Sequence, residues 1–178
     1  LYQQKLWPHR ERGEGHFVAK FRKEDFEKPS HFHVASFPKV SAAAQKQFQL
    51  FWQETLAQAP LPTSLTQLGE HLYAVHPKMP YVKNLRILRP GVYLGQVKKN
   101  RFIPAHHLAM VQEAATLPDA VNFTADDPDL FRYLYGEILP ISRKNGWVLI
   151  SVDHFPLGWG KVSHGILKNH FPKSLRFH

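Results

Sequence analysis

The sequence contains no cysteine among its 178 residues. This absence excludes disulfide scaffolds, thiolate zinc sites, iron–sulfur clusters and reactions that use a cysteine nucleophile. It also fits a reducing compartment. No apolar run approaches the roughly 20 residues that span a bilayer, and the N-terminus lacks the apolar stretch of a signal peptide. We therefore expect a cytoplasmic protein with no membrane partner. The sequence also lacks an initiator Met, which suggests a piece of a longer chain.

Acidic residues are scarce, and one long segment lacks them altogether. The chain has 23 Lys and Arg against 14 Asp and Glu, for a net charge of +9. His71 to Gln112 carries seven basic and no acidic residues, Glu113 to Pro140 carries six acidic and one basic, and Ile141 to the C-terminus carries six basic and one acidic. Two basic segments that pack side by side would form a positive face for phosphates, with the acidic insert behind it. The alternative is an ordinary solubilising surface.

Three helices are predicted. Ser41 to Gln58 has a capping serine followed by apolar residues near one face. A helix from His106 to about Ala115 follows a Pro-Ala pair. The third runs from Pro128 to about Tyr135, with Asp127 as its N-cap and Gly136 placed to end it.

Short strands make up most of the remaining pattern. Gly15–Phe21 and Gly146–Asp153 are apolar, β-prone runs bounded by turn residues or charges. Pro156–Gly160 has the Pro and Gly content of a turn. From about Leu61 onward, short strands, Gly and Pro turns and short helices predict an α+β fold built on a small mixed β-barrel. A strand–helix segment precedes this barrel.

Known catalytic and cofactor motifs are missing. Gly158–Val162 resembles part of a phosphate loop but lacks its spacing and its hydroxyl residue. There is no Gly-x-Gly-x-x-Gly turn and no nucleophile elbow. The 12 histidines show no metal-ligand spacing with an accompanying carboxylate, so no metal site is assigned to them. We expect no catalytic residues and no cofactor in this chain.

Aromatic residues interleave with the basic residues, a pattern typical of proteins that hold single-stranded nucleic acid. Trp159 lies between two glycines and is expected to be exposed, whereas Trp147, inside an apolar strand, is expected in the core. Asn169 beside Lys168 could contact a base edge and a phosphate; the alternative is that Asn169 or Lys161 caps a turn and is needed for folding. The candidate RNA-binding residues are Arg86, Arg89, Lys98, Lys99, Arg101, Trp159, Lys161, Lys168, Asn169, Lys173 and Arg176.

Several segments together resemble one protein family. Leu6–Arg10 and Gly13–Ala19 resemble the closing strand region of the Sun-type RNA cytosine-5 methyltransferases. Five further segments resemble the C-terminal extension of the bacterial RsmF (YebU) type: Leu88–Gly95, Lys98–Ala109, Gly146–Leu149, Pro156–Lys161 and Leu167–Lys173. The last two segments resemble the signature of that family's PUA-like RNA-binding module.

The resemblance implies that catalysis and RNA binding are carried out by different domains. Members of the family methylate cytosine in ribosomal RNA with S-adenosylmethionine, using a cysteine nucleophile that this chain lacks. Residues 1–23 would be the end of a methyltransferase domain, 24–62 a linker and pre-PUA helix, and 63–178 a PUA-like RNA-binding module. The chain would then be no enzyme by itself, but would position ribosomal RNA for the upstream catalytic domain. The alternative is a protein–protein docking module whose basic face meets an acidic partner.

Overall fold

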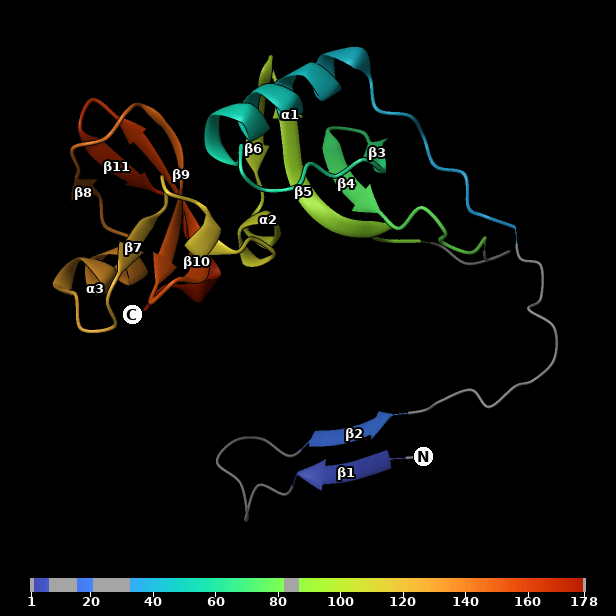
Figure 1. The fold of residues 1–178 in the computed structure, drawn as a ribbon, viewed down its shortest axis with the longest axis horizontal. Helices are drawn as coiled ribbons and strands as arrows, with labels where there is room; N and C mark the ends of the chain where they lie inside the picture. Colours follow the sequence, from blue (N-terminus) through green and yellow to red (C-terminus); the bar gives the residue numbers. More distant parts are fainter. Residues whose placement is uncertain (1, 7–15, 21–32, 82–86, 178) are drawn as a thin grey trace. The chain divides into compact units, whose positions relative to one another are not determined.

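The structure, a computed structural model, describes residues 2–6, 16–20, 33–81 and 87–177. The chain divides into two compact units, Leu1–Phe32 and His33–His178. In the first unit, β1 (Tyr2–Leu6) pairs antiparallel with β2 (His16–Lys20), both drawn in blue in Figure 1. β2 confirms the strand predicted for Gly15–Phe21.

The second unit contains two sheets. One has the order β3-β4-β5-β6 and is antiparallel throughout; we call it the β3–β6 sheet. The other, the C-terminal sheet, has the order β7-β9-β10-β11-β8, with β7 parallel to β9. The strand bounds are β3 Leu65–Leu68, β4 His71–Val75, β5 Gly91–Lys98, β6 Arg101–Pro104, β7 Val121–Phe123, β8 Leu139–Pro140, β9 Gly146–Val152, β10 Phe155–Ser163 and β11 Ile166–Asn169. With the short helices below, this is the predicted α+β fold.

Two of the predicted helices form as expected. α1 (Ala42–Thr55) begins after Ser41, whose hydroxyl accepts a hydrogen bond from the Ala44 N–H at 3.3 Å. α3 (Pro128–Tyr135) begins after Asp127, whose carboxylate accepts the Asp129 N–H at 2.8 Å. It ends at Gly136, which has a φ of 89°. That left-handed conformation is easily reached by glycine and closes the helix.

The third helix is shorter than predicted. α2 covers only His106–Met110, and a separate turn of 3-10 helix follows at Ala114–Thr116. The α-helical hydrogen-bond pattern stops at Gln112. Its side-chain amide, in place of its backbone N–H, donates to the Leu108 carbonyl at 2.9 Å, and the backbone N–H donates to the Ala109 carbonyl. The predicted extension to Ala115 is therefore wrong.

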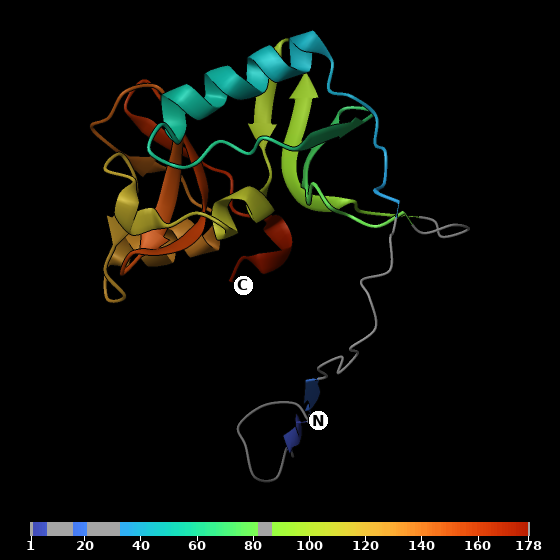
Figure 2. The same cartoon turned by 45° about the vertical axis from the view of Figure 1, so that its right-hand side comes forward.

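α1 packs against both sheets, and Figure 2 shows it running above them. Its apolar residues Phe48, Phe51, Trp52 and Leu56 enter a core shared by Leu72, Leu94 and Phe102 of the β3–β6 sheet and by Leu149 and Trp159 of the C-terminal sheet. We call the face of the C-terminal sheet that meets this core its front face. Because one helix binds both sheets, residues of β6 and of the C-terminal sheet are held near one another.

The back face of the C-terminal sheet packs on α3. This second core joins Leu130 and Tyr133 of α3 to the sheet residues Val148, Ile150, Val162 and Leu167. Side chains alternate between the faces of a strand, so the odd-numbered residues of β9 and the neighbouring Lys161 of β10 belong to the front face. Neighbouring residues along each strand therefore serve two different cores.

The turn predicted at Pro156–Gly160 is wrong: these residues lie within β10. The chain reverses instead at Asp153 and His154, which have φ values of 47° and 67°. Gly158 allows Tyr133 to pack closely against the strand, since a Cβ at this position would lie 2.8 Å from the hydroxyl oxygen of Tyr133. Glycine and proline content alone does not distinguish a turn from a strand that another element approaches closely.

Candidate nucleic-acid interface

Three side chains form a row across the front face of the C-terminal sheet. Trp147 of β9 lies directly opposite Lys161 of β10, and Lys161 lies directly opposite Lys168 of β11. His170 follows Lys168 by two residues, which returns it to the same side of the chain. We call these four residues the front cluster. Such a row can form because all three strands are adjacent and in register at this point.

Ring contacts hold the front cluster together. The imidazole of His170 lies 4.5 Å from the Trp147 ring, centroid to centroid, in an edge-on arrangement. The Lys161 ammonium lies 5.4 Å from the centroid of the same ring, which is within the range of a cation–π contact. Trp147 and Lys161 are both partly exposed. An indole that is held by these contacts yet remains partly accessible can stack on a planar group.

A small cavity of about 210 Å³ opens between the front cluster and β6. It is lined by Trp147, Lys161 and His170 on one side, and by Arg101, Phe102 and Ile103 on the other. Enclosing clefts for drug-sized ligands measure roughly 300–1,000 Å³, so this cavity suits one part of a larger ligand. Two cations and an aromatic ring fit a phosphate and a base.

The electrostatics of the front cluster favour an anion. Like charges directly opposite each other in a sheet are destabilising, yet Lys161 and Lys168 are paired in this way. The salt bridges among the described residues join Lys98 to Glu70 and Arg132 to two acids, and none involves this lysine pair. Burial of the imidazole, and then the charges of Lys161 and Lys168, lower the pKa of His170. A bound phosphate would relieve this concentration of positive charge.

The acidic insert lies partly on the other side of the sheet. α3 carries Asp129 and packs through Leu130 and Tyr133 on the back face. Its Arg132 guanidinium is already paired with Asp129 at 2.8 Å and with Glu137 at 2.9 Å. Asp129 is thus separated from the front cluster by the thickness of the sheet, whereas Asp119 of the same acidic insert lines a hollow that also contacts Trp147.

A larger hollow, of about 810 Å³, is also lined by Trp147. The residues before β9 supply Arg143 and Lys144 to it, while Glu54 and Asp119 bring negative charge. The Arg143 guanidinium donates to the backbone carbonyls of Asp119 and Ala120, at 2.9 and 3.3 Å. Mixed charge and an engaged arginine make this hollow less suited to a polyanion than the front cluster.

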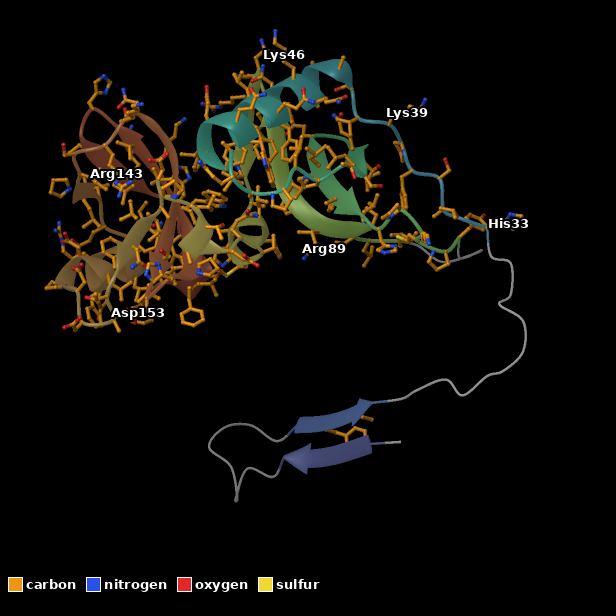
Figure 3. The ribbon with its side chains drawn as sticks, in the orientation of Figure 1. His33, Lys39, Lys46, Arg89, Arg143 and Asp153 are labelled. Carbon is orange, nitrogen blue, oxygen red and sulfur yellow. The ribbon has the colours of Figure 1, made fainter. Side chains whose placement is uncertain are left out.

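The predicted basic residues of the first segment separate in space. Lys98 and Arg101 face each other across the β5–β6 turn, and only Arg101 lines the cavity. Lys98 lies 3.8 Å from Glu70, and Lys99 forms the turn with a φ of 43°. Arg89 is exposed between β4 and β5, and Figure 3 shows it apart from Arg143 beside the C-terminal sheet. The candidate Arg86 lies outside the described residues.

Trp159 is not exposed, and that prediction is wrong. Only 1% of its surface is accessible, and its indole N–H donates to the Ala105 carbonyl at 2.9 Å. Its ring centroid lies 5.7 Å from that of Phe51 in α1. The physical reason is that the flanking glycines belong to a strand under α1, so Trp159 fills the shared core and cannot stack on a base.

Asn169 and Arg176 are engaged in the fold. The Asn169 amide donates to the carbonyls of Tyr133 and Glu137, at 2.7 and 3.2 Å, and its oxygen accepts the Phe171 N–H at 2.9 Å. The guanidinium of Arg176 donates twice to the Phe171 carbonyl, at 3.3 and 3.2 Å. This geometry supports the structural alternative for Asn169 over a base contact. Lys173 is exposed in a short 3-10 turn.

Sequence reasoning missed Trp147 and His170 as site residues. The apolar strand predicts Trp147 in the core, and the ring does pack against the shared core; it stands at the start of β9, however, where it also lines the cavity. One signal was present: Lys168 and His170 alternate with the buried Leu167 and the half-buried Asn169. Strand periodicity therefore puts the two basic side chains on one face.

Other kinds of site are not evident in the part of the chain described. Within it, no group of three or more His, Asp or Glu side chains converges to hold a metal ion. The helices of the same part include none that is long and apolar enough to cross a membrane.

Comparison with known families gives two matches. Residues 50–111 match the family described as the RsmF rRNA methyltransferase first C-terminal domain, and residues 120–177 match the methyltransferase RsmF PUA domain. The second match contains all four residues of the front cluster, while Arg101 belongs to the first. The predicted boundaries at residues 23 and 62 stay a prediction, and the two matches divide the stretch that was predicted as a single module of residues 63–178.

Proposed function

This chain belongs to the RsmF family of rRNA methyltransferases, whose first C-terminal domain and PUA domain it contains, and we propose that it binds ribosomal RNA through the front cluster. The PUA domain match supports RNA as the partner. The family resemblance of the N-terminal segments, Leu6–Arg10 and Gly13–Ala19, supports an upstream methyltransferase domain of the same protein as the second partner. The proposed role is to hold the RNA while that domain modifies it.

The observation that carries this proposal is the pairing of Lys161 with Lys168 beside Trp147. Two lysines opposite each other cost stability unless an anion lies between or above them. Phosphates of a nucleic acid supply that anion, and the accessible indole supplies a stacking surface for an unpaired base. Arg101 lines the cavity together with Lys161 and can contact a neighbouring phosphate in the same way.

The chemistry of methylation is assigned to the upstream domain. Attack on a cytosine ring requires an activated nucleophile such as a thiolate, and this chain contains no cysteine. We propose that S-adenosylmethionine binds to that domain, that the product is 5-methylcytosine in ribosomal RNA, and that the protein works in the cytoplasm. The family match and the resemblance support these finer assignments.

The test is a fluorescence anisotropy titration of a single-stranded rRNA fragment at several salt concentrations. For a single strand, each phosphate contact contributes about 0.7 to the slope of log affinity against log salt. The double variant Lys161→Ala/Lys168→Ala is therefore expected to bind more weakly, with a slope reduced by about 1.4. Its melting temperature should be unchanged or slightly raised, because a like-charge pair has been removed.

The matched control is Lys39→Ala/Lys46→Ala, which makes the same change of charge. Both lysines are exposed, and Figure 3 labels them on the α1 side, away from the C-terminal sheet. Equal losses of affinity in both double variants would contradict a defined site and indicate diffuse charge attraction. If polyglutamate competed as well as RNA for the unmodified chain, the alternative function of docking to an acidic protein would be favoured instead.

A further inference from the structure

The β3–β6 sheet has a second face, turned away from α1. Leu72, Leu94 and Phe102 point into the shared core, so the residues that alternate with them lie on the outer face. There Tyr73 of β4 and Tyr93 of β5 are directly opposite each other. Their ring centroids are 5.2 Å apart and the ring planes are tilted by 38°. Both side chains remain partly exposed.

Both rings are held by contacts: Tyr93 by a hydrogen bond, and Tyr73 by packing against the Tyr93 ring. The hydroxyl of Tyr93 is hydrogen-bonded to Nδ1 of His71 at 2.9 Å, and the Gln96 amide lies 3.4 Å from the same nitrogen. His107 of α2 packs edge-on against Tyr93, with the ring centroids 6.1 Å apart. We call the set His71, Tyr73, Tyr93 and Gln96 the tyrosine face. Rings held in this way lose little conformational freedom when a ligand stacks on them.

Charge on this face favours a polyanion over an acidic or apolar surface. Arg101 lies opposite Lys98 across the β5–β6 turn. The Lys98 ammonium is paired with Glu70 at 3.8 Å, so Arg101 is the cation of this pair that is left for a phosphate, and the stretch from His71 to Gln112 has no acidic residue. Burial, and then the neighbouring Tyr73, raise the pKa of Tyr93. Its phenol therefore stays neutral at physiological pH and does not repel a phosphate.

The tyrosine face is continuous with the cavity at the front cluster. Gln96 lies directly opposite Ile103 of β6, and Ile103 lines the cavity together with Trp147 and Lys161. Arg101 belongs to both places, because it faces Lys98 across the β5–β6 turn and also lines the cavity. The edge strand β6 thus connects one partly exposed aromatic surface to the other.

We propose that a single strand of RNA bound at the front cluster continues over β6 and places a further base on Tyr73 and Tyr93. This inference rests on the proposed function, and extends it from the PUA domain to the first C-terminal domain. An unpaired base fits because its face is free to stack, whereas the faces of paired bases are covered by their neighbours. The bound RNA strand would then extend across both domains.

The experiment compares a short and a long single-stranded RNA, of about 4 and about 16 nucleotides, the range of sites found for single-strand-binding domains. Tyr73→Leu keeps an apolar side chain but removes the aromatic face. It is expected to lower affinity for the long RNA by roughly five-fold or more, and to leave the short RNA bound at the front cluster unaffected. Tyr73→Phe keeps the ring and is expected to bind like the unmodified chain.

Phe155→Leu is the matched control, because Phe155 is 73% exposed at the β9–β10 turn. It should change neither affinity. A second readout needs no variant: photo-crosslinking of the long RNA, substituted with 4-thiouridine, is expected to label peptides that contain Tyr73 or Tyr93. Melting curves of each variant confirm that it is folded at the temperature of the titration.

The outcomes separate the two proposals. If Lys161→Ala/Lys168→Ala weakens both RNAs while Tyr73→Leu weakens neither and no crosslink maps to the tyrosine face, the inference is overturned and the proposed function stands. If both variants bind both RNAs like the unmodified chain, the proposed function falls as well. A loss confined to the long RNA in Tyr73→Leu, with retention in Tyr73→Phe, supports the inference.

Discussion

Trp147 and Trp159 project from the same face of the same sheet, on adjacent strands, yet their surroundings differ. Trp159 is 1% exposed and its indole N–H is bound to a backbone carbonyl. Trp147 is partly exposed and lies beside Lys161 and His170 at a cavity. The comparison shows how one face of a sheet can supply both a core and an accessible surface, which here is the proposed binding site.

Distance from α1 accounts for the difference. Trp159 lies opposite Leu149 and against Phe51 of the helix, in the middle of the shared core. Trp147 comes two residues before Leu149, at the start of β9, where its cross-strand neighbour is a lysine. The strand thus passes from solvent-facing contacts to buried ones within a single step of its two-residue repeat.

The largest expected effect comes from removing the buried ring. Trp159→Ala leaves a cavity in the shared core and an unpaired carbonyl at Ala105, so we expect it to lower the free energy of unfolding by about 3–5 kcal/mol. Chemical denaturation followed by circular dichroism measures this change. Molecules that remain folded should bind RNA with near-normal affinity, because Trp159 is buried and not accessible to RNA.

Trp147→Ala is the matched control, since it removes the same side chain from the same face. It should cost much less stability, because the ring is already partly exposed to water, and it should weaken RNA binding. A stability loss as large as that of Trp159→Ala would show that both rings are core residues and would remove the distinction between them.

A smaller effect is expected from pH. Because burial and the nearby lysines lower the pKa of His170 in the folded chain, the unfolded chain takes up a proton more readily at this site. Stability is therefore fully present above the ordinary histidine pKa of about 6.5, and falls as the pH drops below that value towards the folded pKa. His106, whose pKa is lowered by burial and by His107, should act in the same direction.

His170→Gln is expected to reduce the drop in melting temperature between pH 7.5 and pH 5.5, without abolishing it. Differential scanning calorimetry at the two pH values checks this, with His154→Gln as a control at an exposed position of the β9–β10 turn. An unchanged drop in His170→Gln would mean that the imidazole is as free in the folded chain as in the unfolded one.

Local features of the fold could be predicted from the sequence where a single residue has a dominant effect. Asp127 and Gly136 define the ends of α3, because a capping carboxylate and a left-handed glycine have few competing uses. The β-prone run at Gly146 also forms a strand, β9, as predicted. The charge pattern predicted an acidic insert behind a basic face made by two packed segments. Asp129 of α3 lies behind the C-terminal sheet, but among the described basic residues of the first segment only Arg101 lines the cavity.

Other features depend on tertiary contacts that no local pattern contains. Gly158 and Gly160 have the composition of a turn, but they occur in β10 because Tyr133 and Leu167 approach the backbone there. The same packing buries Trp159, contrary to the prediction that it is exposed, and engages the side-chain amide of Asn169 in hydrogen bonds within the fold. Pairing of Trp147 with Lys161 depends on the register between strands, which becomes known only with the structure.

The most direct test of this account follows the indole N–H signals of the chain's four tryptophans in ¹H–¹⁵N spectra during titration with single-stranded rRNA. Trp147→Phe and Trp159→Phe assign the two signals of interest. We expect the Trp147 signal to shift progressively with RNA while the Trp159 signal, hydrogen-bonded inside the core, stays in place. A shift of Trp159 without Trp147, or RNA binding that moves neither signal, would contradict the assignment of the front cluster as the RNA contact.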